Sequence, residues 1–193
     1  MERQIIATFD DEGIIVYQAF KPSIANEALR NRAFGKGFKL NRMTWIKPSF
    51  GWILYRSKYA SKHRQESILK IKITHEGFQT IIAKGVPTSF EPSLFNSEED
   101  WRRELQRSEV RYQWDPDRDL RLRRLNSRAL QLGIRGSMIR NYANKWILEI
   151  EDVTELAHNI KTAIEQDHKK LPTVPSERVY EVSIDIQRNL RMI

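Results

Sequence analysis

The chain has 193 residues, of which 40% are hydrophobic and 30% charged, and its formal net charge is +8. This composition predicts one folded domain and excludes a disordered chain, and no apolar run approaches the roughly 20 residues that a membrane-spanning helix needs. Cysteine is absent, which excludes thiol nucleophiles, disulfides and cysteine-based zinc sites.

The first residues favour a β-hairpin followed by a helix. Residues 4–9 and 14–20 are rich in β-branched and aromatic side chains, and they flank the turn sequence DDEG. Residues 22–34 then have helical spacing, with Pro22 at the start and Gly35 just past the end. No basic segment followed by an apolar one precedes the hairpin, so no secretory signal is expected, and we expect a cytoplasmic protein.

The next stretch is strongly basic, because residues 28–65 contain ten Lys or Arg and no Asp or Glu. Within it, RMTWIKPSFGWILYRS (residues 42–57) predicts a strand over MTWIK and a helix that begins at Pro48 and Ser49. The N–H groups at a helix start attract anions, so we expect an anion site beside Lys47. The alternative is that the aromatic side chains are core and the cations extend past them to water.

Strands and helices alternate through the middle of the chain. Residues 67–74 alternate apolar and polar side chains, as a strand with one wet face does, and a helix over 76–84 follows. Ser97 and Asp100 resemble a capping box that starts the helix EEDWRRELQRS.

A second notable stretch is RYQWDPDRD, which predicts a strand over residues 109–114 and a turn over 116–119. Alternation sends Gln113 and Asp115 to the same side of this strand, among several arginines. A carboxylate in such surroundings stays ionised at neutral pH, where it can stabilise a cation or accept a proton. The alternative is a turn with local pairing of Asp and Arg.

The remaining sequence predicts one or two strands in LRLRRL and RALQLGI, a short helix in SMIRNYANKW, a strand over 146–153 and a helix capped by Thr154. The tail from Pro172 onward is predicted as a linker plus a short extended piece. We therefore expect one α+β domain over residues 1–170, with a largely antiparallel or split β-sheet and packed helices, and a C-terminal extension over 171–193.

Residues 101–145 form a second basic block, with twelve basic and five acidic residues. If the two blocks meet around one hollow, the natural ligand is a nucleic acid or a phosphate-rich nucleotide. The alternative is a solvated basic surface. The motifs GxGxxG, GxxxxGK[ST] and GxSxG are absent, and the four histidines have no metal-binding spacing, so no metal is expected.

The stretches IIVYQAF, RMTWIKPSFGWILYRS, YQWDPDRDLRLR and RALQLGI, in this order, resemble the family known as domain of unknown function 4291. The WIKPSF and QWDP words are specific to the resemblance. The usual family turn reads Pro-Glu-Arg, whereas this chain has Pro116, Asp117 and Arg118.

A more distant similarity is to the ADP-ribosyltransferases, some of which act on nucleic acids. It implies NAD as the nucleotide, and Gln113 and Asp115 as a catalytic Q-x-E motif in which Asp replaces Glu. The first strand lacks the Arg or His that is usual in that fold. The residues implied in NAD binding are Tyr17, Arg42, Trp45, Lys47, Ser49 and Arg56.

Two functions from different classes follow. The first is an NAD-dependent ADP-ribosyltransferase-like enzyme that acts on a nucleic acid or another anionic acceptor, in which Asp115 stabilises the ribosyl cation. The second is a non-catalytic nucleic-acid-binding module, in which cations meet phosphates and aromatic side chains stack on bases. A plain interaction scaffold would instead leave Gln113 and Asp115 facing solvent, with no cleft toward Lys47.

Overall fold

A long antiparallel hairpin forms the centre of the larger sheet. In the computed structural model, which describes residues 2–193, β7 (Val110–Arg118) pairs with β8 (Arg124–Ile134). Three short strands complete this sheet. The strand β6 (Gly85–Pro87) pairs with β7 in parallel. On β8, β1 (Glu2–Arg3) pairs in parallel and β4 (Thr44–Ile46) pairs antiparallel. This pairing brings β4 against the C-terminal part of β8.

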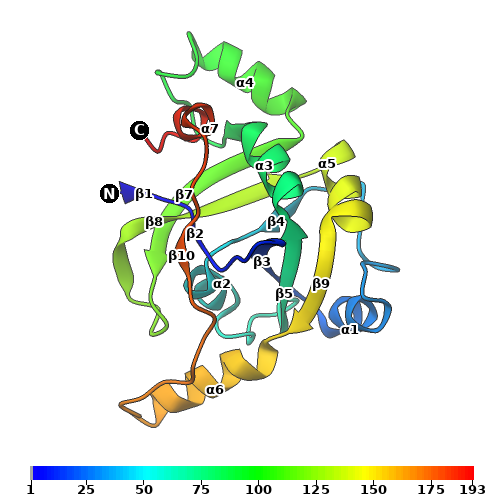
Figure 1. Ribbon diagram of the computed structural model, residues 1–193, viewed down its shortest axis with the longest axis vertical. Coiled ribbons are helices and arrows are strands. Elements are labelled where there is room, and N and C mark those ends of the chain that lie inside the picture. The colour runs from blue at the N-terminus through cyan, green and yellow to red at the C-terminus, as the bar shows by residue number, and fades with distance from the viewer. Residues whose placement is uncertain (1) are drawn as a thin grey trace.

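A second, antiparallel sheet contains β3 (Gly13–Phe20), β5 (Ser67–Thr74) and β9 (Ile147–Asp152), with β5 in the middle (Figure 1). The two sheets meet at a bridge in which the Tyr17 N–H donates to the Lys47 carbonyl over 2.7 Å and the Lys47 N–H donates back over 3.2 Å. The expected α+β domain with a largely antiparallel, split sheet is therefore confirmed.

The helices begin where the local sequence predicts. Pro22 starts α1, the Ser49 hydroxyl accepts the Trp52 N–H at the start of α2, and Ser97 accepts the Asp100 N–H at the start of α4. The helical segments are α1 (Pro22–Asn31), α2 (Phe50–Ser57), α3 (His75–Ala83), α4 (Glu98–Arg107), α5 (Gly136–Asn141), the π-helical turn η1 (Tyr142–Trp146), α6 (Thr154–Glu165) and α7 (Ile184–Asn189).

The core has two parts, on opposite faces of the smaller sheet. Alternation along β3 sends Ile14 and Val16 into one apolar cluster and Ile15 and Tyr17 into the other. The second cluster also contains the apolar faces of α2 and α6. Gln18 follows Tyr17 along β3, so its side chain lies on the opposite face of the strand. The face that carries Gln18 is the one that reaches the candidate site.

The predicted hairpin of residues 4–9 and 14–20 is reduced to one antiparallel bridge between Phe9 and Ile14, because Ile6–Ala7 pair with the C-terminal tail. Two further local predictions are wrong. The turn predicted over 116–119 begins later, because β7 continues to Arg118. The irregular pairing of β7 with β8 after Pro116 tolerates a proline in the strand. The carboxylate of Asp119 then closes the turn by accepting two backbone N–H groups. Thr154 is the first residue of α6 and does not cap it, because its hydroxyl accepts a backbone N–H from β5.

The C-terminal tail runs back along the domain from α6 to α7 (Figure 1). Its predicted extended piece is β10 (Arg178–Val179), which pairs with β2 (Ile6–Ala7). Tyr180 and Leu190 are buried in the main core, and α7 lies between them. Residues 171–193 thus contain a helix and core side chains in addition to the predicted linker.

Candidate functional site

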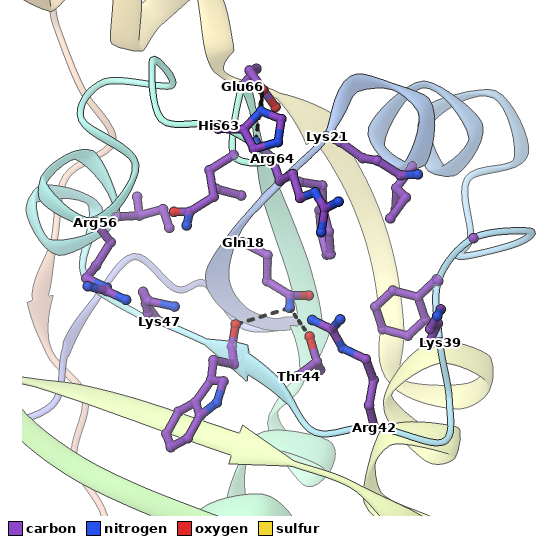
Figure 2. A pocket seen from close by; sticks show the side chains of 18 of the residues that line it. Gln18, Lys21, Lys39, Arg42, Thr44, Lys47, Arg56, His63, Arg64 and Glu66 are labelled. Atoms are coloured by element: carbon purple, nitrogen blue, oxygen red, sulfur yellow. Dashed lines mark hydrogen bonds and ion pairs between the residues drawn. The ribbon is translucent and has the colours of Figure 1, made fainter.

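The turn from β4 to α2 organises the candidate site. Lys47 follows β4, and its backbone is held by the bridge to Tyr17. Pro48 and Ser49 then lead directly into α2. The backbone of Lys47 is fixed in this way, while its side chain points into a pocket (Figure 2).

The pocket beside Lys47 has a volume of about 720 Å³. Its walls come from the end of β3, the loop before β4, β4 itself, one side of α2 and the loop before β5. The larger sheet adds Gln131 of β8. The volume lies within the range of small-molecule sites, roughly 300 to 1,000 Å³.

Positive charge dominates this pocket. Six Lys or Arg side chains line it beside one carboxylate, Glu66. Within residues 2–193, none of the six side chains makes a hydrogen bond or an ion pair with the protein. The six are Lys21, Lys39, Arg42, Lys47, Arg56 and Arg64. Their charges are therefore free to interact with an anionic ligand.

The carboxylate of Glu66 makes no ion pair with these six cations. Its Oε1 accepts the backbone N–H of Arg64 over 2.9 Å and lies 3.6 Å from His63 Nδ1. The hydrogen bond from the Arg64 N–H is the main cause of a lowered pKa for Glu66. The pocket thus keeps a strong excess of positive charge at neutral pH.

Lys47 is the most buried of the six cations, with 7% of its surface exposed. The pKa of Lys47 is lowered to about 7, mainly by burial and also by the nearby Arg56, while the charge of Asp115 opposes both effects. A lysine with an ordinary pKa of 10.5 would be fully charged at neutral pH. The charged and uncharged forms of Lys47 therefore coexist near neutral pH.

Gln18 makes the inner wall of the pocket rigid. Its Nε2 donates to Thr44 Oγ1 over 2.8 Å and to the Trp45 carbonyl over 3.1 Å (Figure 2). Its Oε1 accepts the Tyr142 hydroxyl over 2.8 Å. Because these bonds join β3, β4 and η1, the pocket is preformed on this side.

Gln113 and Asp115 lie on the same side of β7, as alternation predicts. Asp115 Oδ2 accepts Gln113 Nε2 over 2.7 Å and Gln131 Nε2 over 3.3 Å. Gln131 lines the pocket, whereas Gln113 and Asp115 are not among the lining residues. Asp115 therefore adjoins the pocket through Gln131 and acts on Lys47 through its negative charge.

Four of the six residues implied in NAD binding line the pocket, namely Arg42, Trp45, Lys47 and Arg56. Tyr17 does not, because its side chain is fully buried on the opposite face of β3, where it packs against Phe50. Ser49 is also buried, and its hydroxyl caps α2. Neither of these two side chains can contact a ligand in the pocket.

The start of α2 is not an open anion site, contrary to expectation. Glu177, from the C-terminal tail, accepts the Phe50 N–H over 2.6 Å, and Ser49 donates to Asp117 over 3.0 Å. Burial raises the pKa of Glu177 to about 7, with a further contribution from Asp117, whose own pKa burial also raises. The protein's own carboxylates thus occupy the place that an anion would take.

The expected meeting of the two basic blocks occurs only in part. The first block supplies five of the six pocket cations, but no arginine of residues 101–145 lines the pocket. The second block contributes to this site in two ways: Gln131 lines the pocket, and the negative charge of Asp115, which accepts a hydrogen bond from Gln131, acts on Lys47. The arginines of the second block lie elsewhere.

Some pocket residues were not singled out from the sequence. Lys39 and Arg64 belong to the acid-free stretch, which was the signal for them. No such signal marks Lys21, Glu66 and Gln131. They reach the same cavity only because β3, β8 and the loop that precedes β5 pack together.

Other kinds of site find little support in the part of the chain that the structure describes. No group of three or more His, Asp or Glu side chains in residues 2–193 could hold a metal ion. The described helices are all too short or too polar to cross a membrane.

Fold and site together define an α+β protein with a cationic pocket where two sheets meet. The chain belongs to the family described as "Domain of unknown function (DUF4291)", whose profile matches residues 4–180. This match confirms the family resemblance of the sequence. Among curated proteins, none matches the chain.

Proposed function

We propose that the cationic pocket binds the phosphates of a nucleotide and that this nucleotide is NAD. The observation that carries the proposal is the group of six unpaired cations around one cavity. Unpaired cations in a concave site favour a ligand with several negative charges. A dinucleotide offers a pyrophosphate together with rings that can contact the apolar walls.

Individual pocket residues suit different parts of NAD. Arg42 and Arg56 have planar guanidinium groups, which can donate two hydrogen bonds to phosphate oxygens. Lys47 adds a third cation when a bound phosphate favours its protonated form. Trp45 lines the same pocket and offers a ring for stacking on a base.

We infer further that the protein transfers the ADP-ribosyl group of NAD. In this reaction the bond between ribose C1 and the nicotinamide nitrogen breaks, and nicotinamide leaves with the bonding electrons. An acceptor attacks the ribosyl cation and loses a proton. Asp115 would stabilise the cation through its charge, and Gln113, which donates to Asp115, would orient the carboxylate. The positive pocket favours a nucleic acid or another anionic molecule as acceptor.

The test is release of nicotinamide from NAD, measured with and without a single-stranded oligonucleotide. Asp115→Ala and Asp115→Asn should each lower the rate about 100-fold or more, because one electrostatic group in a preorganised site contributes on this scale. Glu104→Gln, which changes an exposed carboxylate of α4, is the matched control and should leave the rate unchanged. Undiminished release by Asp115→Ala would refute the catalytic role of Asp115.

A second candidate function is a non-catalytic nucleic-acid-binding module. The observation that favours it is a set of basic residues on the β7–β8 hairpin that are separate from the pocket: Arg121, Arg123, Arg124 and Arg128. Such a module predicts oligonucleotide affinity that falls steeply with salt, in proportion to the phosphates neutralised. Binding that is independent of salt would rule it out, and thermal stabilisation by NAD alone would favour the transferase.

A further inference from the structure

Lys47 combines three features that ordinary surface lysines lack. Its side chain is more than nine-tenths buried, it lines a cavity of about 720 Å³, and its Nζ has no hydrogen-bond partner among residues 2–193. Figure 2 shows this amine pointing into the pocket, next to Arg56. Burying most of a lysine side chain with no hydrogen bond to its amine is costly to the fold, and this cost points to a function for the amine in the pocket that it faces.

The surroundings of Lys47 favour its uncharged form. Arg56 of α2 is the cation that acts on it most directly, and Asp115 of β7 is the opposing carboxylate. The neighbouring side chains of β3 and β8, Gln18 and Gln131, carry no charge. The rest of the pocket adds cations and one carboxylate, Glu66, which is bonded to backbone. Desolvation and an adjacent cation are the two devices by which proteins turn lysine into a nucleophile.

We propose that the Lys47 amine captures the carbonyl carbon of a small phosphorylated aldehyde as an imine, while the unpaired cations of the pocket hold the phosphate. Arg42, Arg56 and Arg64 supply fixed positive charge for that phosphate. The phosphate and the carbonyl are thus recognised by different groups of one cavity. This chemistry goes beyond the proposed reaction of NAD, because it needs neither nicotinamide release nor Asp115.

The reaction balances without an oxidant or a reductant. The nitrogen lone pair of Lys47 attacks the carbonyl carbon and forms a carbinolamine, after proton transfer from nitrogen to oxygen. The hydroxyl of the carbinolamine then leaves with the remaining amine proton as one water molecule, and the carbon–nitrogen double bond forms. The reverse reaction with water restores the free amine, so the capture is reversible.

The test uses pyridoxal 5′-phosphate as the probe, at less than one equivalent, followed by borohydride reduction and peptide mapping by mass spectrometry. Pyridoxal without the phosphate is the matched probe. Lys47 should be labelled at least 10-fold faster than exposed Lys62, which lies outside the pocket. The preference for the phosphorylated probe at Lys47 should also be at least 10-fold. The rate of labelling by pyridoxal, which brings no phosphate charge into the pocket, should rise with pH around a midpoint near 7.

Two variants complete the experiment. Lys47→Arg should remove the rapid label, and Lys62→Gln should leave it unchanged. The proposal is overturned if wild-type Lys47 is labelled no faster than Lys62, if both probes label Lys47 equally, or if the midpoint lies near the ordinary lysine value of 10.5. The first of these outcomes is measured on the unaltered chain, so it does not depend on the folding of a variant. Because the labelling uses no NAD, its failure and the failure of nicotinamide release are independent results.

Discussion

The two basic blocks of this protein differ in the contacts that their cationic side chains make within the protein. The cations of residues 28–65 that line the pocket have no partner within residues 2–193. Most arginines of residues 101–145 pair with a carboxylate or donate to a backbone carbonyl: Arg102, Arg103, Arg111, Arg118, Arg121, Arg123, Arg128, Arg135 and Arg140. The cationic side chains of the first block are thus free to bind a ligand in the pocket, whereas most arginines of the second block are already held by contacts within the protein.

A second contrast lies within the β4–α2 turn itself. On one side, Lys47 faces the pocket without a partner. On the other side, two or three residues further along, Ser49 and the backbone of Phe50 are bonded to Asp117 and Glu177. The hydrogen bonds of Ser49 and Phe50, which we call the matched side, hold the turn in place. The side of Lys47, which we call the unmatched side, remains available for a ligand.

The largest expected effect comes from removing the unmatched amine. Lys47→Met should raise the free energy of unfolding by about 4 kcal/mol at or below pH 7, because the lowered pKa of Lys47 measures the cost of burying its charge. The folded state binds this proton less tightly than the unfolded state. The cost is therefore full below pH 7 and declines as pH rises from about 7 to 10.5.

Urea unfolding of wild type and Lys47→Met at pH 6, 8 and 10 measures this difference. Lys62→Met, at an exposed lysine, is the control and should change the stability little at any pH. A gap between wild type and Lys47→Met that is independent of pH would contradict the prediction.

Removing three cations from each block tests the contrast between the blocks. The triple change Arg42→Gln, Arg56→Gln and Arg64→Gln should weaken binding of pyrophosphate or NAD about 100-fold, about 3 kcal/mol, because charge-assisted hydrogen bonds to phosphate are lost. Isothermal titration calorimetry at fixed ionic strength measures this affinity. The matched triple change of Arg121, Arg123 and Arg128 to Gln should leave this affinity within about threefold, since these side chains lie outside the pocket and their charges are screened by salt. Equal losses from both triples would end the distinction drawn between the blocks.

The matched side of the turn should respond to pH in its own way. Because burial raises the pKa of Glu177 to about 7, its contribution to stability is full below about pH 4.5 and is lost as pH rises to about 7. Glu177→Gln should remove this loss and exceed wild type by about 2 kcal/mol at pH 8, since the amide oxygen can still accept the Phe50 N–H. Unfolding at pH 4, 6 and 8 checks this, and parallel profiles for the two proteins would argue against it.

The smallest effect is expected for an ion pair on the surface of the second block. Arg103 pairs with Asp100 on α4, where both side chains are exposed by more than a third. Arg103→Gln should change the free energy of unfolding by less than about 1 kcal/mol, as exposed pairs usually do. Thermal unfolding at low and at high salt measures the change, and a loss of several kcal/mol would show that this pair is more than a surface contact.

Much of the candidate site followed from local signals. The strand MTWIK and the helix start at Ser49 were predicted from turn and capping residues, and the acid-free stretch pointed to Arg42 and Lys47. Alternation correctly placed Gln113 and Asp115 on one side of β7. These predictions succeeded because each depends on residues close together in the chain.

The predictions that failed depend on distant partners. The helix start of α2 was expected to bind an anion, but Glu177 reaches it from 127 residues away along the chain. The expected contact of Tyr17 with a ligand does not fit its place in the core, because both faces of β3 are covered and alternation alone does not say which face carries a site.

The sequence by itself determined the α+β class, most of the helix and strand positions, and the stretch from which most of the pocket cations come. Periodicity, capping residues and charge are local properties, so they can be read before the chain folds. Tertiary structure decided which cations converge on one cavity, which arginines are held by carboxylates or backbone carbonyls, and that the Lys47 side chain is buried without a hydrogen-bond partner. Burial and pairing arise from contacts between segments far apart in the chain, and it is these contacts that turn a basic sequence into a site with unmatched charge.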